Sequence, residues 1–195
     1  ERGRFVAAFE QVCQAVAYAH AHNVIHRDLK PANVMVGEFG EVQVMDWGLA
    51  KVLGAHPIVE DDPGATVGVA EVRTLRDSED QFTQAGSALG TPAFMPPEQA
   101  VGAIGKIDAR SDVFGLGAIL AVILTGKPPF DGPTAVAILM RHATLPLPDL
   151  PASVPAPLRA LVSRCLAKSP VDRYQTPTDL VAALAGHELT IDATM

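Results

Sequence analysis

The sequence predicts a mainly α fold (α+β) with a small β-hairpin sheet beside a polar loop. Apolar residues recur at helical spacing near the N-terminus and over most of the chain after residue 112, whereas only short β-type runs lie between residues 24 and 45. The 195 residues suit one domain, and 48% hydrophobic with 19% charged residues is the composition of a globular chain rather than a disordered one.

The first predicted element is a helix that begins near Phe5 and ends at residues 20–23. Its apolar positions follow the helical period: Phe5, Phe9, Val12, Cys13, Val16 and Ala17. We expect Asn23 to cap its C-terminal end, because asparagine accepts the left-handed backbone conformation of such caps better than most residues do.

The chain then changes to short strands around the polar loop. Residues 24–25 and 34–36 are β-type runs on either side of the loop 26–33, and a third run, 42–45, follows a turn at 37–40. The second and third runs are therefore expected to pair as a hairpin that directly follows the loop.

A long loop with strong negative charge is predicted over residues 52–90. It shows no sustained period and is rich in Gly, Asp, Thr and Ser, and loops of that length are uncommon in compact domains unless they have a function or are disordered. Residues 60–80 hold seven acidic and two basic residues, which gives −5 of the chain's net charge of −7. The acidic balance argues against nucleic-acid binding, which requires a basic stripe.

Helices dominate the rest of the chain. The run from 112 to 125 is apolar almost all round, which is typical of a central buried helix, and two prolines soon after it are expected to end it. Thr176, Pro177 and Asp179 give the last helix a start signal of the capping-box type. Between these helices the sequence predicts, in order, a helix at 134–142, a connector with five prolines at 146–157 and a helix at 158–166.

The polar loop carries the residues that could perform chemistry. Asp28, Lys30 and Asn33 place an acid, a cation and an amide between two apolar strands, and the hairpin would bring Asp46 back beside Asn33. Phosphoryl transfer to a hydroxyl needs a residue that orients the hydroxyl and accepts its proton, a cation that offsets phosphate charge, and ligands for Mg²⁺. Two oxygen ligands from separate strands suit Mg²⁺, which also retains waters and binds phosphate oxygens.

Five motifs, in order along the chain, resemble those of eukaryotic-type protein kinases in their bacterial serine/threonine form. Residues 26–33 read HRDLKPAN and resemble the catalytic loop, in which Lys30 is typical of the serine/threonine type. The other motifs are Asp46-Trp47-Gly48 for DFG, Gly90 to Glu98 for the segment that closes the activation loop, Asp112 to Gly117 for the start of the central helix, and the lone Arg173. The resemblance covers nearly the whole chain and implies a protein-kinase-like large lobe.

The resemblance also implies a role for each matching residue, with ATP and Mg²⁺ as the cofactors. Asp28 would be the catalytic base, and Lys30 would contact the γ-phosphate of ATP. Asn33 and Asp46 would hold the metal ions that bridge the phosphates. Thr91 would lie near Asp28 and Lys30 and help to select the hydroxyl of Ser or Thr.

Five further residues would have regulatory or structural roles in such a lobe. Arg27 would pair with a phosphate on the activation loop and order that segment. His26 would have a structural hydrogen-bonding and packing role, and Asp112 would begin the central helix. Glu98 and Arg173 would form a buried ion pair whose value is more geometric than energetic, because desolvation offsets much of the attraction.

The expected domain is the large lobe at residues 1–187, followed by a tail at 188–195. Within it the activation segment, 46–98, is longer than the family usually has. We expect a mobile insertion within 54–86.

The sequence also departs from the family pattern. No G-x-G-x-x-G precedes Asp28, and the 27 residues before it are too few for the family's small lobe, so we expect a large-lobe fragment that binds ATP weakly and transfers phosphate poorly. Trp47 replaces the expected Phe, with a larger ring and an added N–H donor, and Pro96 replaces Ala.

The predicted function is ATP-dependent phosphorylation of Ser or Thr in protein substrates, with the small lobe of the same chain as the other partner. The alternative is a pseudokinase, a binding or scaffold module without phosphotransfer. Such a module would be expected to lose at least one of the residues that carry the chemistry, which are Asp28, Lys30, Asn33 and Asp46. A small-molecule kinase ranks lower, because such enzymes typically lack the Lys30 form and the segment 91–98.

A cytoplasmic location is expected, either for the protein itself or for the cytoplasmic part of a longer, membrane-anchored one. The two cysteines cannot form a disulfide framework and fit a reducing compartment. The longest apolar stretch, 113–124, has only twelve residues, which is too short to span a membrane.

Overall fold

The computed structural model describes residues 2–54 and 91–186. The helices are α1 (Arg2–Ala21), α2 (Pro97–Ala100), α3 (Ala109–Thr125), α4 (Ala135–Thr144), α5 (Ala156–Cys165) and α6 (Pro177–Ala185). The strands are β1 (Val24–Ile25), β2 (Val34–Val36), β3 (Val42–Val44) and β4 (Lys51–Val52). Apart from residue 54, the predicted mobile insertion lies outside the described residues, as does the predicted tail.

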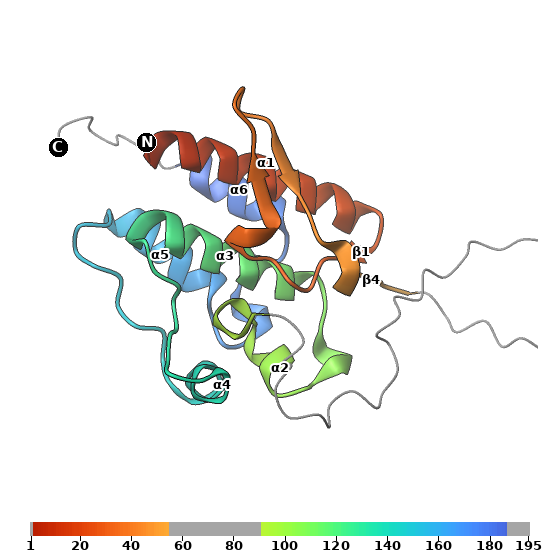
Figure 1. The fold of residues 1–195 in the computed structure, drawn as a ribbon, viewed down its shortest axis with the longest axis vertical. Coiled ribbons are helices and arrows are strands. Elements are labelled where there is room, and N and C mark those ends of the chain that lie inside the picture. The colour runs from red at the N-terminus through yellow and green to blue at the C-terminus, as the bar shows by residue number, and fades with distance from the viewer. Residues whose placement is uncertain (1, 55–90, 187–195) are drawn as a thin grey trace, which may run out of the picture.

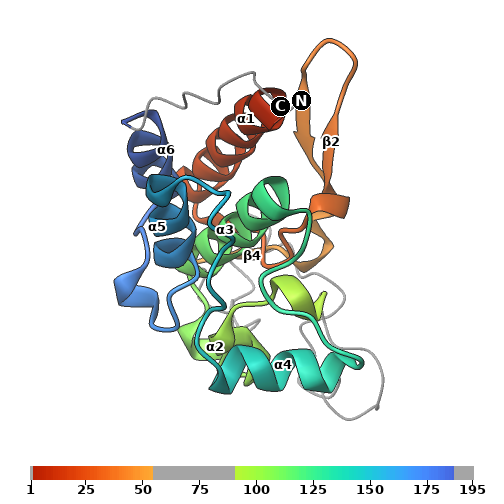
Figure 2. The same cartoon turned by 90° about the vertical axis from the view of Figure 1, so that its left-hand side faces the viewer.

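The centre of the domain is α3, which contacts α1 on one side and α5 on another (Figures 1 and 2). Its side chains are buried on nearly every face, which confirms the central helix that the apolar run predicts. The helix begins at Ala109, ahead of the predicted start at Asp112, because the Asp108 side chain caps it by accepting a hydrogen bond from the Arg110 amide. It ends at Thr125, as predicted, and Gly126 follows in the left-handed conformation, with φ 76°, before the prolines.

Two glycines let neighbouring chain segments approach α3 closely. A Cβ atom at Gly115 would lie 2.8 Å from the Cβ of Leu29 in the polar loop 26–33, and one at Gly117 would lie 2.3 Å from the Cβ of Cys165 in α5. Neither distance is compatible with a side chain, so the glycines set how closely the polar loop and α5 pack on the central helix.

In the described part of the chain, the β structure consists of two antiparallel two-stranded sheets rather than the single hairpin predicted. Strands β2 and β3 pair as expected, with Val34 opposite Val44 and Val36 opposite Val42. Strand β1 pairs with β4, and the Leu53 amide extends the contact by donating to the Asn23 carbonyl at 2.7 Å. Strand β4 was not predicted, because a strand of two residues shows no alternation of apolar and polar side chains.

The two predicted helix caps, at Asn23 and at Thr176 with Asp179, are present, and α4 has a cap at Thr134 that was not predicted. Asn23 follows α1 in the left-handed conformation, with φ 59°. Thr134 caps α4 by accepting from the Ala137 amide at 3.1 Å. Thr176 and Asp179 bond reciprocally at the start of α6, at 3.1 and 3.0 Å, and so form the predicted capping box.

Both cysteines lie as free thiols in the core, where α1 and α5 pack with α3 and α6. Burial raises the pKa of Cys165 to about 12, and burial and the neighbouring Cys165 raise the pKa of Cys13. Within residues 2–54 and 91–186, no helix combines the length and the apolar character needed to cross a membrane.

Candidate active site

The polar loop 26–33 is tied to the central helix through one buried carboxylate. Asp112, 1% exposed, accepts a hydrogen bond from the His26 amide at 2.7 Å and another from the Arg27 amide at 2.8 Å. His20, at the end of α1, contacts the same carboxylate through Nε2 at 2.7 Å. Asp112 therefore sets the position of the loop, and sequence reasoning missed His20 because no local spacing links two residues 92 positions apart.

The Asp28 carboxylate is the point at which the predicted catalytic residues meet. Lys30 Nζ donates to its Oδ2 at 2.7 Å, and Asn33 Nδ2 donates to the same oxygen at 3.3 Å and to the Asp28 carbonyl at 2.8 Å. The Thr91 amide donates to its Oδ1 at 3.3 Å. The structure thus brings these four residues together, and it does so for Thr91 through the main chain rather than through its hydroxyl.

His26 joins the two motifs that the sequence separates. It is fully buried, and its Nδ1 accepts a hydrogen bond from the Asp28 amide at 3.2 Å. The other ring nitrogen, Nε2, must then carry the proton, which it donates to the Met45 carbonyl at 2.9 Å. Through these two hydrogen bonds the His26 ring joins the loop to Met45, the residue before Asp46.

Asp46 lies at the end of the hairpin in a left-handed conformation, with φ 57° and ψ 65°. Its neighbour Met45 donates an amide hydrogen bond to the Asn33 carbonyl at 2.8 Å, so the two predicted metal ligands belong to adjoining chain segments. Its exposed carboxylate accepts from the Gly48 amide at 3.4 Å.

Trp47 fits the position at which the family pattern has Phe. Its Nε1 donates to the Val44 carbonyl at 2.9 Å, which satisfies the polar atom that Phe lacks. Its ring lies 4.6 Å from the His26 ring, centroid to centroid, in a tilted arrangement typical of aromatic pairs.

The donor atoms present suit a hard cation that is also bound by phosphate and water. Asn33 uses its Nδ2 to hold Asp28, which leaves its amide oxygen for a metal, and Asp46 offers exposed carboxylate oxygens. Mg²⁺ is commonly held by one or two protein oxygens of this kind. Among the described residues there is no cluster of three or more His, Cys, Asp or Glu side chains that could hold a metal by protein ligands alone.

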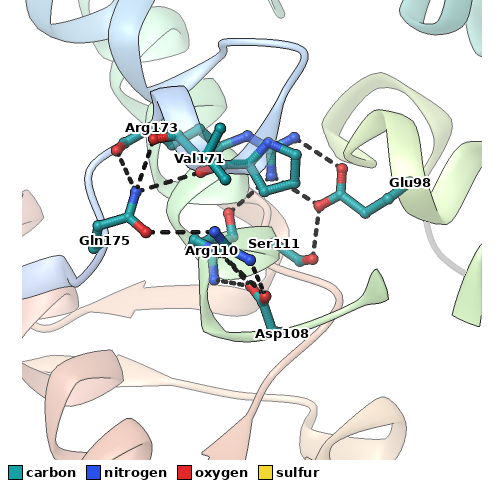
Figure 3. Close-up of polar contacts among 8 residues, drawn as sticks. Glu98, Asp108, Arg110, Ser111, Val171, Arg173 and Gln175 are labelled. Atoms are coloured by element: carbon teal, nitrogen blue, oxygen red, sulfur yellow. Dashed lines mark hydrogen bonds and ion pairs between the residues drawn. The ribbon is translucent and has the colours of Figure 1, made fainter. Parts of the chain in front are cut away.

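A second polar network lies under the site, around Arg173 (Figure 3). Arg173 is fully buried and binds Glu98 with both terminal nitrogens at 2.8 Å, and Ser111 Oγ donates to the same carboxylate at 2.7 Å. The remaining Arg173 donors bond the carbonyls of Ala167, Arg110 and Lys168. The predicted buried ion pair is confirmed, and it is fully hydrogen-bonded, as a charge pair of this kind must be.

Arg110 and Asp108 form the outer part of that network. Burial favours the neutral Asp108 side chain, but hydrogen bonds from Arg110 and its charge outweigh burial and hold the pKa of Asp108 below its ordinary value. Arg110 also reaches Gln175 at 3.4 Å, and Gln175 in turn donates to the Arg173 carbonyl at 2.8 Å. The two ends of the network therefore join the start of α3 to the segment that holds Arg173 (Figure 3).

Arg27, the residue expected to bind a phosphate, lies beside Asp28 with its main chain in the left-handed region, φ 70°. Its Nε is buried and has no hydrogen-bond partner among the residues that the structure describes. The central part of the predicted activation segment lies outside those residues.

Comparison with known proteins agrees with the geometry. Residues 2–184 match the protein kinase domain family. Serine/threonine-protein kinase PknB from Mycolicibacterium smegmatis is 38% identical over 184 residues, which cover 93% of this chain and 26% of that protein. PknB from Mycobacterium tuberculosis H37Ra is 35% identical with the same coverage, and the probable serine/threonine-protein kinase CE0033 from Corynebacterium efficiens is 36% identical, covering 89% of this chain and 24% of that protein.

The chain therefore spans about a quarter of the length of the curated relatives it matches. The predicted fold class is confirmed by the family match together with the observed helical domain and its small sheets. The chain belongs to the protein kinase domain family.

Proposed function

We propose that the chain is the large lobe of a serine/threonine protein kinase, which transfers the γ-phosphoryl group of ATP to Ser or Thr hydroxyls of protein substrates. The observation that carries the proposal is the convergence of Lys30, Asn33 and the Thr91 amide on the Asp28 carboxylate. The names of the bacterial relatives support the choice of Ser and Thr as acceptors.

Asp28 would orient the substrate hydroxyl and accept its proton as the new P–O bond forms. Its Oδ1 is held by the Thr91 amide and its Oδ2 by Lys30 and Asn33, so the carboxylate has a fixed orientation before a substrate arrives. A base that is already oriented avoids the cost of reorganisation during the reaction.

Lys30 would offset negative charge on the phosphoryl group as it moves, since its Nζ lies 2.7 Å from the oxygen of the base. Asn33 and Asp46 would hold Mg²⁺ through their side-chain oxygens. When bound, the metal neutralises charge on the phosphates, and ATP supplies the transferred group.

The other partner is a small lobe that covers the nucleotide. The family's Gly-rich loop and strand lysine hold the phosphates of ATP, and no G-x-G-x-x-G occurs ahead of Asp28. We propose that residues elsewhere in the same protein supply this lobe, and that the kinase acts in the cytoplasm, where the two free thiols remain reduced.

The proposal is tested on the full-length protein that carries these residues, with ATP, Mg²⁺ and peptides that differ only in a Ser, Thr or Tyr acceptor. Asp28→Asn is expected to lower kcat by about 10²- to 10⁴-fold, because it removes the base while it keeps the side-chain shape. Asp131→Asn is the matched control, since the Asp131 side chain is 78% exposed and far from Asp28 in the sequence.

Phosphorylation of Ser and Thr peptides that Asp28→Asn abolishes would support the function. Wild-type protein that binds ATP but transfers no phosphate would favour the scaffold alternative. Equal activity of Asp28→Asn and wild type would rule out the proposed base.

A further inference from the structure

Gln99 contacts the polar loop 26–33 at a main-chain carbonyl, whereas Asp112 contacts it at two main-chain amides. It lies in α2, next to the ion-paired Glu98, and its Nε2 donates to the Arg27 carbonyl at 3.1 Å. The two residues are 72 positions apart, so the contact exists only in the folded lobe. Nothing in the motif that surrounds Gln99 points to the loop.

The Arg27 carbonyl belongs to the peptide group that precedes Asp28. The N–H of the same peptide group, the Asp28 amide, donates to His26 Nδ1 at 3.2 Å. This peptide is thus fixed at both ends, by Gln99 at its oxygen and by His26 at its nitrogen. The preceding peptide is fixed by Asp112, which accepts from the Arg27 amide at 2.8 Å.

These bonds hold a backbone that would otherwise relax. Arg27 has φ 70°, in the left-handed region that residues other than glycine seldom adopt, and such a conformation persists only where the surroundings determine it. Asp112 holds the nitrogen side of Arg27, and Gln99 holds its carbonyl side. Without Gln99 the peptide plane before Asp28 loses the only side-chain donor that the described residues direct at its oxygen.

We propose that Gln99 is a positioning residue that fixes the orientation of Asp28 through the Arg27 carbonyl; the catalytic consequence rests on the proposed kinase function. The segment 91–99 then controls Asp28 at two points, because the Thr91 amide holds the carboxylate and Gln99 holds the peptide before it. The segment that closes the activation loop is in this way bonded directly to the base.

The orientation of the Gln99 amide follows from its partner. The Arg27 carbonyl is an acceptor, so the nitrogen of the amide must face it, and the other atom, Oε1, is buried without a partner among the described residues. Glutamate at this position has no donor and would direct an oxygen at the carbonyl. Methionine has nearly the same length and no donor, so the two variants separate repulsion from simple loss of the bond.

The experiment compares Gln99→Met and Gln99→Glu with wild type in the full-length protein. Gln14→Met is the matched control, since Gln14 is an exposed residue of α1. We expect kcat to fall about tenfold in Gln99→Met and further in Gln99→Glu, with the KM for ATP unchanged, because a displaced base impairs the chemical step and not nucleotide binding. Rates are expressed per folded molecule, with the folded fraction taken from circular dichroism.

Hydrogen–deuterium exchange of peptides that contain residues 26–30 gives a second readout that needs no activity. Faster exchange of these peptides in both Gln99 variants, and not in Gln14→Met, is expected. Unchanged exchange, or unchanged kcat in an active protein, would overturn the proposal. If the wild-type protein transfers no phosphate but the Gln99 variants still exchange faster at residues 26–30, the kinase assignment would be overturned and the positioning role of Gln99 would remain supported.

Discussion

At the residue scale, one carboxylate holds the polar loop 26–33 in place. Asp112 accepts hydrogen bonds from two consecutive loop amides, and His20 contacts it as well, all within 2.8 Å. A buried carboxylate is stable in the core only while such donors surround it. The loop and the central helix therefore depend on each other.

Asp112→Asn is expected to lower the free energy of unfolding by about 2 kcal/mol or more, because one acceptor oxygen becomes an NH₂ group that faces donors. Urea unfolding followed by circular dichroism measures the change. Asp172→Asn, at an exposed position, is the control and should unfold like wild type. An unfolding midpoint for Asp112→Asn equal to that of the control would mean that the network contributes nothing to stability.

His142 makes stability depend on pH. It is fully buried, with ring centroids 4.4 Å from Phe130 and 5.7 Å from Phe114. Burial and the charge of Lys168 outweigh a favourable contact with the Ala93 main chain and lower the pKa of His142 from 6.5 to about 4. The folded state therefore resists protonation of a ring that the unfolded state protonates readily.

The contribution of His142 to the free energy of unfolding is fully present above pH 6.5. It is lost as the pH falls towards 4, because the unfolded chain binds the proton at a higher pH than the folded protein does. Once the pH is below both pKa values, the loss in the free energy of unfolding amounts to about 3 kcal/mol. Urea midpoints between pH 7 and 4.5 should fall less steeply in His142→Leu than in wild type, whereas the exposed His22→Leu should keep the wild-type slope. Parallel slopes for all three proteins would show that His142 does not titrate as described.

The sequence predicted the residues that meet at Asp28, because Lys30 and Asn33 lie on the same short loop and the motif resemblance identified Thr91. It could not predict His20 or Gln99. Both act through contacts between residues 72 to 92 positions apart, and a histidine at a helix end or a glutamine in a short helix has no pattern that indicates a distant partner.

At the element scale, α3 requires glycine where other segments cross it. Replacing glycine by alanine in a helix normally stabilises it by about 1 kcal/mol. Gly117→Ala is expected to do the opposite and to destabilise the fold by about 1–3 kcal/mol, because its Cβ would overlap the Cβ of Cys165 at 2.3 Å. The shift of the thermal unfolding midpoint relative to wild type shows whether Gly117→Ala stabilises or destabilises the fold.

Gly115→Ala gives a second outcome on the same helix, because its Cβ would press on Leu29, the neighbour of Asp28, at 2.8 Å. We expect its kcat in the full-length protein to fall more than its stability does. Gly105→Ala is the control for both variants, since a Cβ there would meet no atom within 4 Å. A stabilised Gly117→Ala would show that α5 can move away from α3 at little cost.

Long helices and helices with a clear capping signal could be predicted from the sequence, whereas very short elements could not. The longer helices were predicted from their apolar period, and α6 was placed correctly by its capping box. Strand β4 and helix α2 have two and four residues, too few for a period, and they form because residues distant in the sequence hold them. The start of α3 was missed because Asp108, which caps it, lies outside the apolar run that predicted the helix, whereas its end at Thr125 was predicted correctly.

At the scale of the whole molecule, the buried Glu98–Arg173 pair holds the end of the predicted activation segment against the segment that contains Arg173, ahead of α6 (Figure 3). Loss of either partner would leave a buried charge without compensation, which typically costs more than the intact pair contributes. The pair thus fixes α2, and with it Gln99, relative to the catalytic loop.

The 195-residue chain by itself is expected to bind ATP weakly, because it offers the phosphates Lys30, Asn33 and Asp46 but no Gly-rich loop. Trp47, the only tryptophan of the chain, lies next to Asp46 and provides an intrinsic fluorescence signal for the titration. ATP and Mg²⁺ that saturate the full-length protein should leave the signal of the isolated chain unsaturated. Saturation over the same concentrations, or robust phosphate transfer by the chain alone, would contradict this.

The two core thiols have a practical consequence. A thiol is alkylated through its thiolate, and both Cys13 and Cys165 are inaccessible and hold their protons far above neutral pH. Iodoacetamide should consequently leave the native lobe unlabelled and modify it only when the helices separate. The rate of labelling would then measure how often the interior opens, and a cysteine introduced on the surface could carry a dye without removal of the native pair.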